Sequence, residues 1–236
     1  MAITEDSWLS ERFGHPVYSV SRDDRELVTH AAGQSAASYQ AKVPAGDVEL
    51  LRALEDAGMR VVSLTLVLSR LPAGEVAPSP ANVVVRQGTA DDRDAVAAIA
   101  ERGFEATRFH LDPDVPRDTA RGIAVEWARN YAIGQRGEQL LVAERDGELV
   151  GFLGVNALDE DGLRLRDIDL VAVAPELRSA GVGTALVERF LVESDGRCDR
   201  VRVGTQASNE RAIALYERLG FITESAHFDL HMHVGA

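Results

Sequence analysis

The chain has 236 residues, 45% of them hydrophobic, and a net charge of −13, because 38 acidic residues outnumber 25 lysines and arginines. This length allows one large domain or two small ones, and the apolar fraction is sufficient for a packed core. The acidic balance argues against a nucleic-acid-binding protein, since binding to the phosphate backbone needs a basic surface.

The cysteine content and the composition of the first residues indicate the cellular compartment of the protein. The single cysteine, Cys198, excludes an intrachain disulfide and is typical of a protein in a reducing environment. The first residues contain neither a basic region nor a long apolar stretch, so we predict no signal peptide. The longest apolar run, residues 61–68, is too short to span a bilayer. We therefore expect a cytoplasmic protein that contacts no membrane.

The first 71 residues are the less regular part of the chain. A helix is predicted over Asp47–Ala57, with Asp47 as its N-cap and Gly58 just after its last turn. A piece of this size buries little apolar surface alone, so we expect it to pack on the rest of the chain. The strands predicted here are Val17–Val20, Ser38–Val43 and Arg60–Ser69.

A linker is predicted at residues 72–80, which contain three prolines and mostly small residues. It separates an N-terminal segment, residues 1–71, from a domain at residues 81–236. The elements predicted in that domain are a strand at Val83–Arg86, helices at Asp91–Arg102 and Asp118–Ile133, a hairpin of Gln139–Glu144 and Glu148–Ala157, a strand at Leu163–Val173, a helix carrying Val182 and Leu186, a strand at Arg200–Gly204, a helix ending at Leu219 and a strand at Ala226–His233.

The most informative segment connects the strand that ends at Val173 to the helix after it. Gly181 and Gly183 lie in this connection, where the first backbone N–H groups of the helix have no intrahelical partner. These donors and the helix dipole favour a phosphate group, and Arg178 adds a positive charge. A dinucleotide fingerprint needs a third glycine that is missing, and a P-loop needs a lysine, whereas Lys42 is the only lysine in the chain.

A second segment, residues 201–221, follows after the length of one helix. Asn209 is a good N-cap and Gly220 a good residue after the last helical turn. Asn209 and Tyr216 are seven residues apart, so they lie on one helical face, about 10 Å apart along the axis. By itself this position also suits a half-buried core tyrosine.

Together the two segments carry a family resemblance. Arg178-x-x-Gly181-x-Gly183 resembles the pyrophosphate-binding signature of the GNAT acetyltransferase superfamily, and Asn209-x-x-Ala212-x-x-x-Tyr216 resembles its second cofactor segment, in family order and spacing. The resemblance implies an α/β (α+β) GNAT fold, with a mixed central sheet flanked by helices and an N-terminal segment that resembles a partial GNAT domain. It implies acetyl-CoA as cosubstrate and no metal. The implied cofactor-binding residues are Val171, Ala172, Val173, Arg178, Ser179, Ala180, Gly181, Val182, Gly183, Thr184, Asn209, Ala212 and Tyr216.

Other segments resemble one subgroup, the acetyltransferases of dTDP-fucosamine (dTDP-4-amino-4,6-dideoxygalactose). They lie at residues 8–17, 58–69 and 107–130, so the resemblance covers nearly the whole chain and is strongest at residues 170–221. Thr107 replaces the usual serine, and Ser179 replaces the glycine often found after the loop arginine. The resemblance implies Arg108, Phe109 and His110 as substrate-binding residues.

The family pattern implies Tyr216 as the general acid that protonates the departing thiolate. Asp169 is the candidate base, and Asp167 shares its strand face unless a bulge intervenes. Both can equally be ordinary or bulge-satisfying carboxylates. Arg108 can contact a diphosphate or form a structural ion pair, and His110 can be a base or a structural histidine.

The function predicted is an N-acetyltransferase acting on a small-molecule amine, with a nucleotide-linked amino sugar as the leading acceptor. The alternatives are another small amine, such as an antibiotic or a polyamine, and a catalytically silent acyl-CoA-binding module. No nucleic-acid partner is expected, and a homodimer is compatible with the sequence.

Overall fold

The computed structural model describes residues 3–21, 27–72 and 82–235, which form a mixed sheet with helices on both faces. The strands are β1 (Ile3–Glu5), β2 (Val17–Val20), β3 (Ala37–Pro44), β4 (Arg60–Arg70), β5 (Val83–Gln87), β6 (Gln139–Arg145), β7 (Glu148–Glu160), β8 (Leu163–Val173), β9 (Arg200–Gln206) and β10 (Ile222–Val234). The helices are α1 (Ser7–Phe13), α2 (Leu27–Ala32), α3 (Val48–Asp56), α4 (Arg93–Gly103), α5 (Arg108–Leu111), α6 (Arg117–Ala132), α7 (Val182–Ser194) and α8 (Glu210–Arg218).

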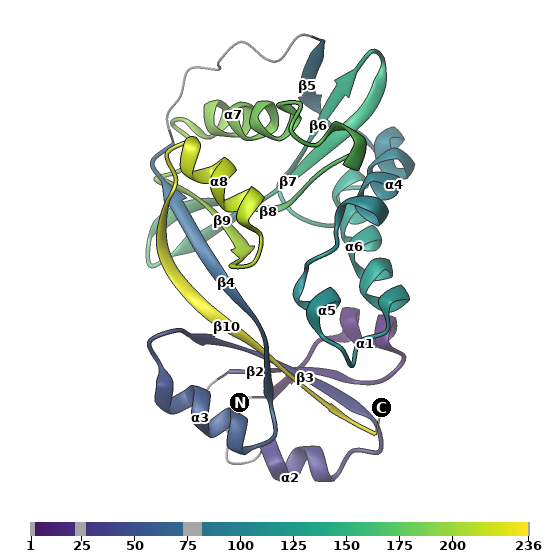
Figure 1. The fold of residues 1–236 in the computed structure, drawn as a ribbon, viewed down its shortest axis with the longest axis vertical. Coiled ribbons are helices and arrows are strands. Elements are labelled where there is room, and N and C mark those ends of the chain that lie inside the picture. Colours follow the sequence, from purple (N-terminus) through teal and green to yellow (C-terminus); the bar gives the residue numbers. More distant parts are fainter. Residues whose placement is uncertain (1–2, 22–26, 73–81, 236) are drawn as a thin grey trace.

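The ten strands are ordered β1-β2-β3-β10-β4-β9-β8-β7-β6-β5, and Figure 1 shows α7 and α8 on one side of the molecule and α4 and α6 on the other. This confirms the predicted mixed sheet flanked by helices. Every predicted element of the described chain forms, with ends shifted by a few residues. The sequence analysis missed β1, α1, α2 and α5, which have three to seven residues and are too short to show a periodic pattern.

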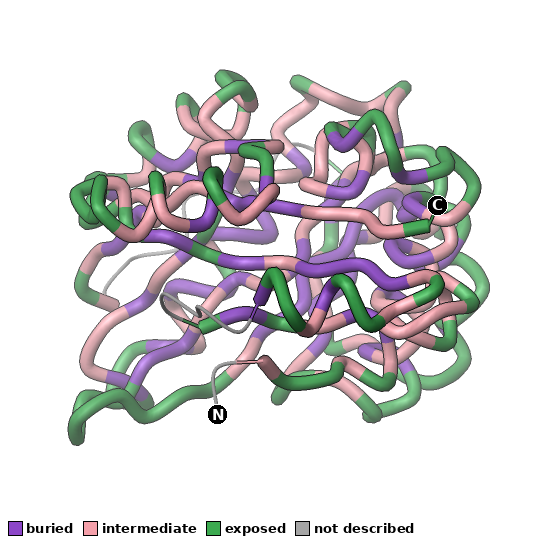
Figure 2. The backbone as a smooth tube through the Cα atoms, turned by 90° about the horizontal axis from the view of Figure 1, so that it is seen from below, coloured by how far each residue is buried: buried purple, intermediate pink, exposed green. Residues whose placement is uncertain are grey.

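Two cores lie on opposite faces of strands β6 to β8. Leu141 and Leu153 pack with α7, whereas Val142 and Phe152 pack with α4 and α6. Successive side chains of a strand point to opposite faces of the sheet. Because both faces of these strands are buried, their sequences are continuous hydrophobic runs. Buried residues accordingly follow the strands through the middle of the molecule, and exposed residues gather in the peripheral helices and loops (Figure 2).

A β-bulge interrupts this alternation in β8. Val155 pairs with Ile168 and Gly154 with Leu170, so Asp169 is an extra residue without a partner on β7. Ile168 belongs to the core beneath α7, whereas Leu170 belongs to the core beneath α4 and α6. After the extra residue, the side chains of β8 therefore point to the opposite faces of the sheet from those that regular alternation would give. Asp169 itself lies outside that alternation.

Strand β4 joins the two parts of the chain that the proline-rich stretch separates in sequence. It pairs with β10 on one side and β9 on the other, both antiparallel. The N-terminal part is thus built into the same sheet, and β4 and β10 cross from the part that holds α8 to the part that holds β2 and β3 in Figure 1. The linker itself, apart from Pro72, lies outside the described residues. Among the described residues, no helix is both long and apolar enough to cross a membrane.

Candidate functional site

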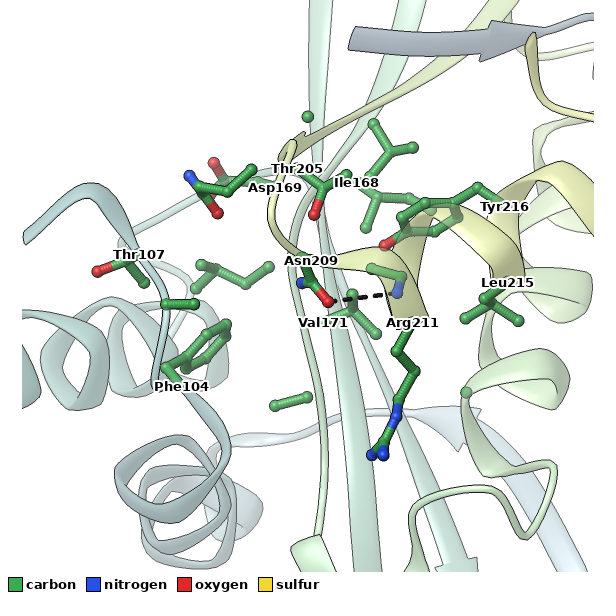
Figure 3. Close-up of a pocket in the computed structure, with 18 of the residues that line it drawn as sticks. Phe104, Thr107, Ile168, Asp169, Val171, Thr205, Asn209, Arg211, Leu215 and Tyr216 are labelled. Atoms are coloured by element: carbon green, nitrogen blue, oxygen red, sulfur yellow. Dashed lines mark hydrogen bonds between the residues drawn. The ribbon is translucent and has the colours of Figure 1, made fainter. Parts of the chain in front are cut away.

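A cavity of about 1220 Å³ lies where both parts of the chain meet. Its lining comes from β3, β4, β8, β9 and β10, from α8, and from the loops before α5 and α7. A cavity of this size, with apolar walls and a few convergent polar groups, has the properties of a ligand site. Figure 3 shows Tyr216 and Asn209 on one side of it, facing Asp169, Thr107 and Phe104.

One wall of the cavity is the diverging pair of strands β8 and β9. Their parallel pairing runs from Leu165 and Arg200 to Ile168 and Val203 and extends no further in the described chain. Val171, Ala172 and Val173 continue along the cavity. Strands that part in this way leave backbone N–H and C=O groups for a ligand to pair with.

The loop before α7 forms one end of the cavity. Of the predicted loop residues, Arg178, Ser179, Gly181, Gly183 and Thr184 line it. Gly181 is the N-cap of α7 with φ of 84°, and Ser179 has φ of 70°, a left-handed conformation that explains why glycine is common there. The first amides of α7 lie here, so an anion can bind at this helix N-terminus.

The remaining predicted loop residues do not line the cavity. Val182 is 1% exposed and packs in the core beneath α7, and Ala180 donates its N–H to the carbonyl of Leu177. The Arg178 guanidinium donates to the carbonyl of Gly103 at 3.0 Å, which ties the loop to the end of α4.

Helix α8 supplies the opposite wall. Asn209 is its N-cap and accepts a hydrogen bond from the N–H of Ala212 (Figure 3), and both residues line the cavity. Tyr216 is 2% exposed and packs against Phe221, yet its hydroxyl is directed toward Asn209 and the cavity. Burial raises the pKa of Tyr216 above its usual range. The phenol is therefore protonated at neutral pH and able to donate.

The bulge carboxylate Asp169 also lines the cavity, but its Oδ2 already has partners. The Arg136 Nε donates to it at 2.8 Å, and the Tyr131 hydroxyl lies 2.8 Å from it and from Oδ1 of Asn156. Burial and the neighbouring carboxylate raise the pKa of Tyr131, so this hydroxyl stays protonated. Asp167 is likewise engaged, because Nε and one terminal nitrogen of Arg202 each donate to one of its carboxylate oxygens at 3.0 Å.

Of the three predicted substrate-binding residues, the structure brings only Arg108 to the cavity. Its guanidinium lies over the Phe109 ring and donates to Gln40 of β3 at 3.1 Å, and burial lowers its pKa from the usual value. Phe109 is 2% exposed in the small core beneath α1 and α6. His110 does not line the cavity, and its Nδ1 lies 2.7 Å from the hydroxyl of Thr107, which does.

Several cavity residues escaped the sequence analysis. Lys42 and Thr65 reach the cavity from the N-terminal part, and His227 and Asp229 from the last strand. The only signal in the sequence is the i, i+2 spacing of His227 and Asp229, which places both on one face of a strand. That their face meets the cavity depends on the strand order.

A chain of hydrogen bonds lies below the cavity. His15 and His233 both contact the Ser38 hydroxyl at 2.8 Å. His231 and His233 in turn contact the same oxygen of Asp112, at 2.6 and 2.9 Å. Their side chains come close enough to surround a cation, but hydrogen bonding among them already accounts for the arrangement. It ties the N-terminal part to β10 and to the loop after α5.

The cavity therefore combines an anion-binding end, a wall of unpaired strand backbone with a protonated phenol beside it, and a charged end. Such a site suits a long ligand that carries phosphate at one end and reacts at the other.

Two curated relatives are similar to this chain. The spore coat polysaccharide biosynthesis protein SpsD of Bacillus subtilis is 28% identical over 195 residues, which cover 82% of this chain and 66% of that protein. The mycothiol acetyltransferase of Streptomyces coelicolor is 30% identical over 192 residues, covering 81% and 56%. The chain thus spans between about half and two thirds of the length of these relatives.

Solved structures share the fold. A GCN5-related N-acetyltransferase from Sphaerobacter thermophilus superposes with a TM-score of 0.60 at 16% identity, over 98% of this chain and 75% of that one. One from Kribbella flavida gives 0.63 at 17% identity, over 92% and 80%. The sequence profile of the acetyltransferase (GNAT) family matches residues 95–221, more than half of the chain. The chain therefore belongs to the acetyltransferase (GNAT) family.

Proposed function

We propose that the protein transfers the acetyl group of acetyl-CoA to the amine of a small acceptor, and that the acceptor is a nucleotide-linked amino sugar. The observation that carries this proposal is the cavity of about 1220 Å³, which brings together the loop before α7, the Tyr216 side chain, and the charged side chains of Lys42 and Arg108.

The residues present fit acetyl-CoA, the cosubstrate that this family uses. The amides of Gly183 and Thr184 at the start of α7 would hold its pyrophosphate, and Arg211 and Arg218 of α8, which also line the cavity, add positive charge. The unpaired edge of β8 near Val171 would pair with the amides of its pantetheine arm. Local donors thus offset the repulsion between an acidic protein and a polyanionic cosubstrate.

Catalysis would rest on positioning, on a backbone N–H of β8 that polarises the thioester carbonyl, and on proton transfer. Tyr216 is suited to protonate the departing thiolate, because burial keeps its hydroxyl protonated. Asp169 is held by Arg136 and Tyr131, so it fixes the wall of the cavity near the reacting end.

Two cations favour an acceptor that carries negative charge. Arg108 and Lys42 line the cavity, and both lie within electrostatic range of Asp229 and Asp169 without an ion pair of 4.0 Å or less among the described residues. A diphosphate would supply their counter-charge. The name of the relative SpsD, a spore coat polysaccharide biosynthesis protein, supports a sugar acceptor. A small cationic amine, such as a polyamine, fits these two charges less well.

The test has two parts. Calorimetric titration with acetyl-CoA measures binding, and a thiol-release assay over a panel of amines, including dTDP-linked 4-amino sugars, measures turnover. We expect tight binding and turnover that is fastest with the dTDP-linked amines. Binding without turnover on any amine would make the protein an acyl-CoA-binding module instead. Its location in the cytoplasm, and whether it forms a homodimer, stay predictions.

A further inference from the structure

We propose that His227 is the catalytic base that takes a proton from the acceptor's ammonium group, and that Asp229 positions its imidazole. The proposal rests on the acetyl transfer proposed above and names a residue pair that the family motifs do not contain. Both residues lie on β10 and line the cavity.

The sheet places His227 in line with the reacting region. His227 pairs with Thr65 of β4, and Thr65 pairs with Gln206 at the end of β9, just past the point where β8 and β9 part. Residues directly opposite in neighbouring strands present their side chains on the same face. All three line the cavity, so His227 is about 10 Å across the sheet from the end of β9, a span that an acceptor fills.

Asp229 is built to stay ionised although it is buried. It is 2% exposed, and its Oδ2 accepts hydrogen bonds of 2.6 Å from both the Ser63 and the Thr65 hydroxyl. Burial alone would raise its pKa, but His227 and these two hydroxyls lower it to about 2. The carboxylate is therefore fixed and charged next to the imidazole.

The orientation of the His227 ring assigns a role to each nitrogen. Its Nε2 is buried and lies 3.5 Å from Oδ1 of Asp229, without a hydrogen bond to any described residue. A buried N–H facing a carboxylate favours the tautomer with the proton on Nε2. Nδ1 is then the free acceptor. Hydrogen bonds between catalytic groups are often long before the substrate binds and shorten in the complex.

The other carboxylates of the cavity are poorer candidates for the base. Asp169 is in an ion pair with Arg136, Asp167 with Arg202, and Glu105 with Arg178. An adjacent guanidinium stabilises the charged form of a carboxylate and weakens it as a base. His227, by contrast, has the carboxylate of Asp229 as its ion-pair partner among the described residues.

The charged groups around His227 come from four other elements. Lys42 of β3 lies opposite Asp229 in the register of the two strands. Arg108 of α5 is within electrostatic range of Lys42. Asp169 of β8 and Arg136 beyond α6 form their own pair at the far wall.

The protons and bonds balance as follows. His227 Nδ1 takes one proton from the ammonium group and later releases it to water. The amine nitrogen forms a bond to the thioester carbon, and the carbon–sulfur bond breaks. Tyr216 gives its proton to the departing sulfur, and the second proton lost by the nitrogen restores the Tyr216 hydroxyl. The products are therefore the amide, the free thiol and one proton released to water.

The experiment compares His227→Gln with His30→Gln, a matched change at a histidine of α2 that does not line the cavity. Single-turnover rates with acetyl-CoA and dTDP-linked 4-amino sugars are measured from pH 5.5 to 9. The wild-type rate should fall toward the acidic end of this range, with one inflection. His227→Gln should lower the rate by ~10²-fold or more, remove this inflection and leave the dissociation constant of acetyl-CoA unchanged.

Two further results bear on the assignment. Asp229→Asn should retain a pH inflection but lower the rate less than His227→Gln does, as expected for a positioning residue. A wild-type rate and pH profile in His227→Gln would overturn the proposal, as would the same loss of the inflection in Asp169→Asn.

An independent readout needs no acceptor. The ring nitrogen chemical shifts of His227 at pH 8 in the acetyl-CoA complex should show the tautomer protonated at Nε2, and Asp229→Asn should shift the population away from it. A ring protonated at Nδ1 would overturn the orientation proposed here. If the wild-type protein binds acetyl-CoA but acetylates no amine, acetyl transfer itself is wrong and the base role fails with it, a result distinct from loss in His227→Gln alone.

Discussion

The Tyr216 side chain packs in the core and also reaches the cavity. Its ring packs at 5.6 Å from Phe221 in the core beneath α7, and its hydroxyl faces the cavity. The structure confirms the core tyrosine that the sequence allowed, and the direction of the hydroxyl supports the proton-donor role proposed above. The two contributions can be separated by removing the hydroxyl alone.

Tyr216→Phe should lower turnover by ~10²-fold, the lower end of the usual range for a lost general acid, because a thiolate is a fairly good leaving group. The Michaelis constant for acetyl-CoA should change little, since the hydroxyl acts mainly in the transition state. Single-turnover kinetics and thermal melts check this, with Tyr18→Phe as a control outside the cavity. Full activity in the variant would assign Tyr216 to the core alone.

Gly183→Val should weaken acetyl-CoA binding by at least tenfold while leaving the fold intact. A Cβ at this position would meet Leu215 at 3.4 Å and Val173 at 3.8 Å, which are ordinary contacts, so the helix can accept a side chain. The branched methyls would occupy the space where a diphosphate approaches the backbone.

The control for that variant is Gly122→Val on α6, where a Cβ meets no atom within 4 Å and which does not line the cavity. Calorimetric titration and the melting temperature of both variants are compared. Normal binding in a folded Gly183→Val protein would show that the pyrophosphate binds elsewhere.

Among the secondary-structure elements, α8 and α3 start in the same way. Each has nine residues and an Asx N-cap, Asn209 for α8 and Asp47 for α3, whose side chain accepts a backbone N–H three residues on. Only the α8 cap faces the cavity. The two helices thus separate the structural effect of a cap from an effect on a ligand.

Asn209→Ala and Asp47→Ala should each lower the free energy of unfolding by about 1 kcal/mol, the usual cost of a lost N-cap. Only Asn209→Ala should also weaken acetyl-CoA binding, because it removes a polar group from the cavity wall. Urea unfolding and titration of both variants measure these effects. Equal acetyl-CoA affinities would limit Asn209 to its capping role.

How far the sequence predicts the site also differs by element. The loop before α7 and the start of α8 are local patterns, so their caps and glycines could be located from spacing alone. The bulge at Asp169 could not be located from the sequence, because one inserted residue changes which face of the sheet the side chains point to without leaving a strong sequence signal. The four-residue α5 brings Arg108 to the cavity but turns Phe109 into the core, and so short a segment has no periodicity to reveal this.

The acceptor end of the cavity is formed by segments that lie far apart in the sequence. Lys42 and His227 are 185 positions apart in the sequence, yet they lie on two strands that pair with each other, β3 and β10. A single sequence does not determine such long-range pairing. The hydrogen bonds of Asp112 with His231 and His233 hold this assembly together from below.

Stability should fall as the pH drops from 7.5 to 5. Burial lowers the pKa of His231, so below about pH 6.5 the unfolded chain binds a proton that the folded chain resists. Below about pH 4 a second loss follows, because the contacts with His231 and His233 outweigh burial and lower the pKa of Asp112.

Urea unfolding at constant ionic strength measures this dependence, and each proton contributes at most about 1.4 kcal/mol per pH unit. His231→Gln should reduce the slope between pH 7.5 and 5, whatever its effect on stability at pH 7.5. A stability that stays constant over that range would contradict the prediction.

A chain that begins at residue 82 should not fold. Strands β9 and β10 meet only through β4, so deleting the N-terminal part removes the strand between them and leaves two edges with unsatisfied backbone groups. Solubility and circular dichroism check this. A soluble, folded product that binds acetyl-CoA would instead support the division into two domains at residues 72–80.

The place of β4 between two late strands also has a consequence during synthesis on the ribosome. About 130 residues separate the end of β4 at Arg70 from the start of β9 at Arg200, which at typical rates of synthesis is a delay of roughly ten seconds. Throughout that time the apolar strand has neither of its final neighbours and both of its edges are open to other chains. During translation, β4 should therefore be the segment of this protein that depends most on chaperones.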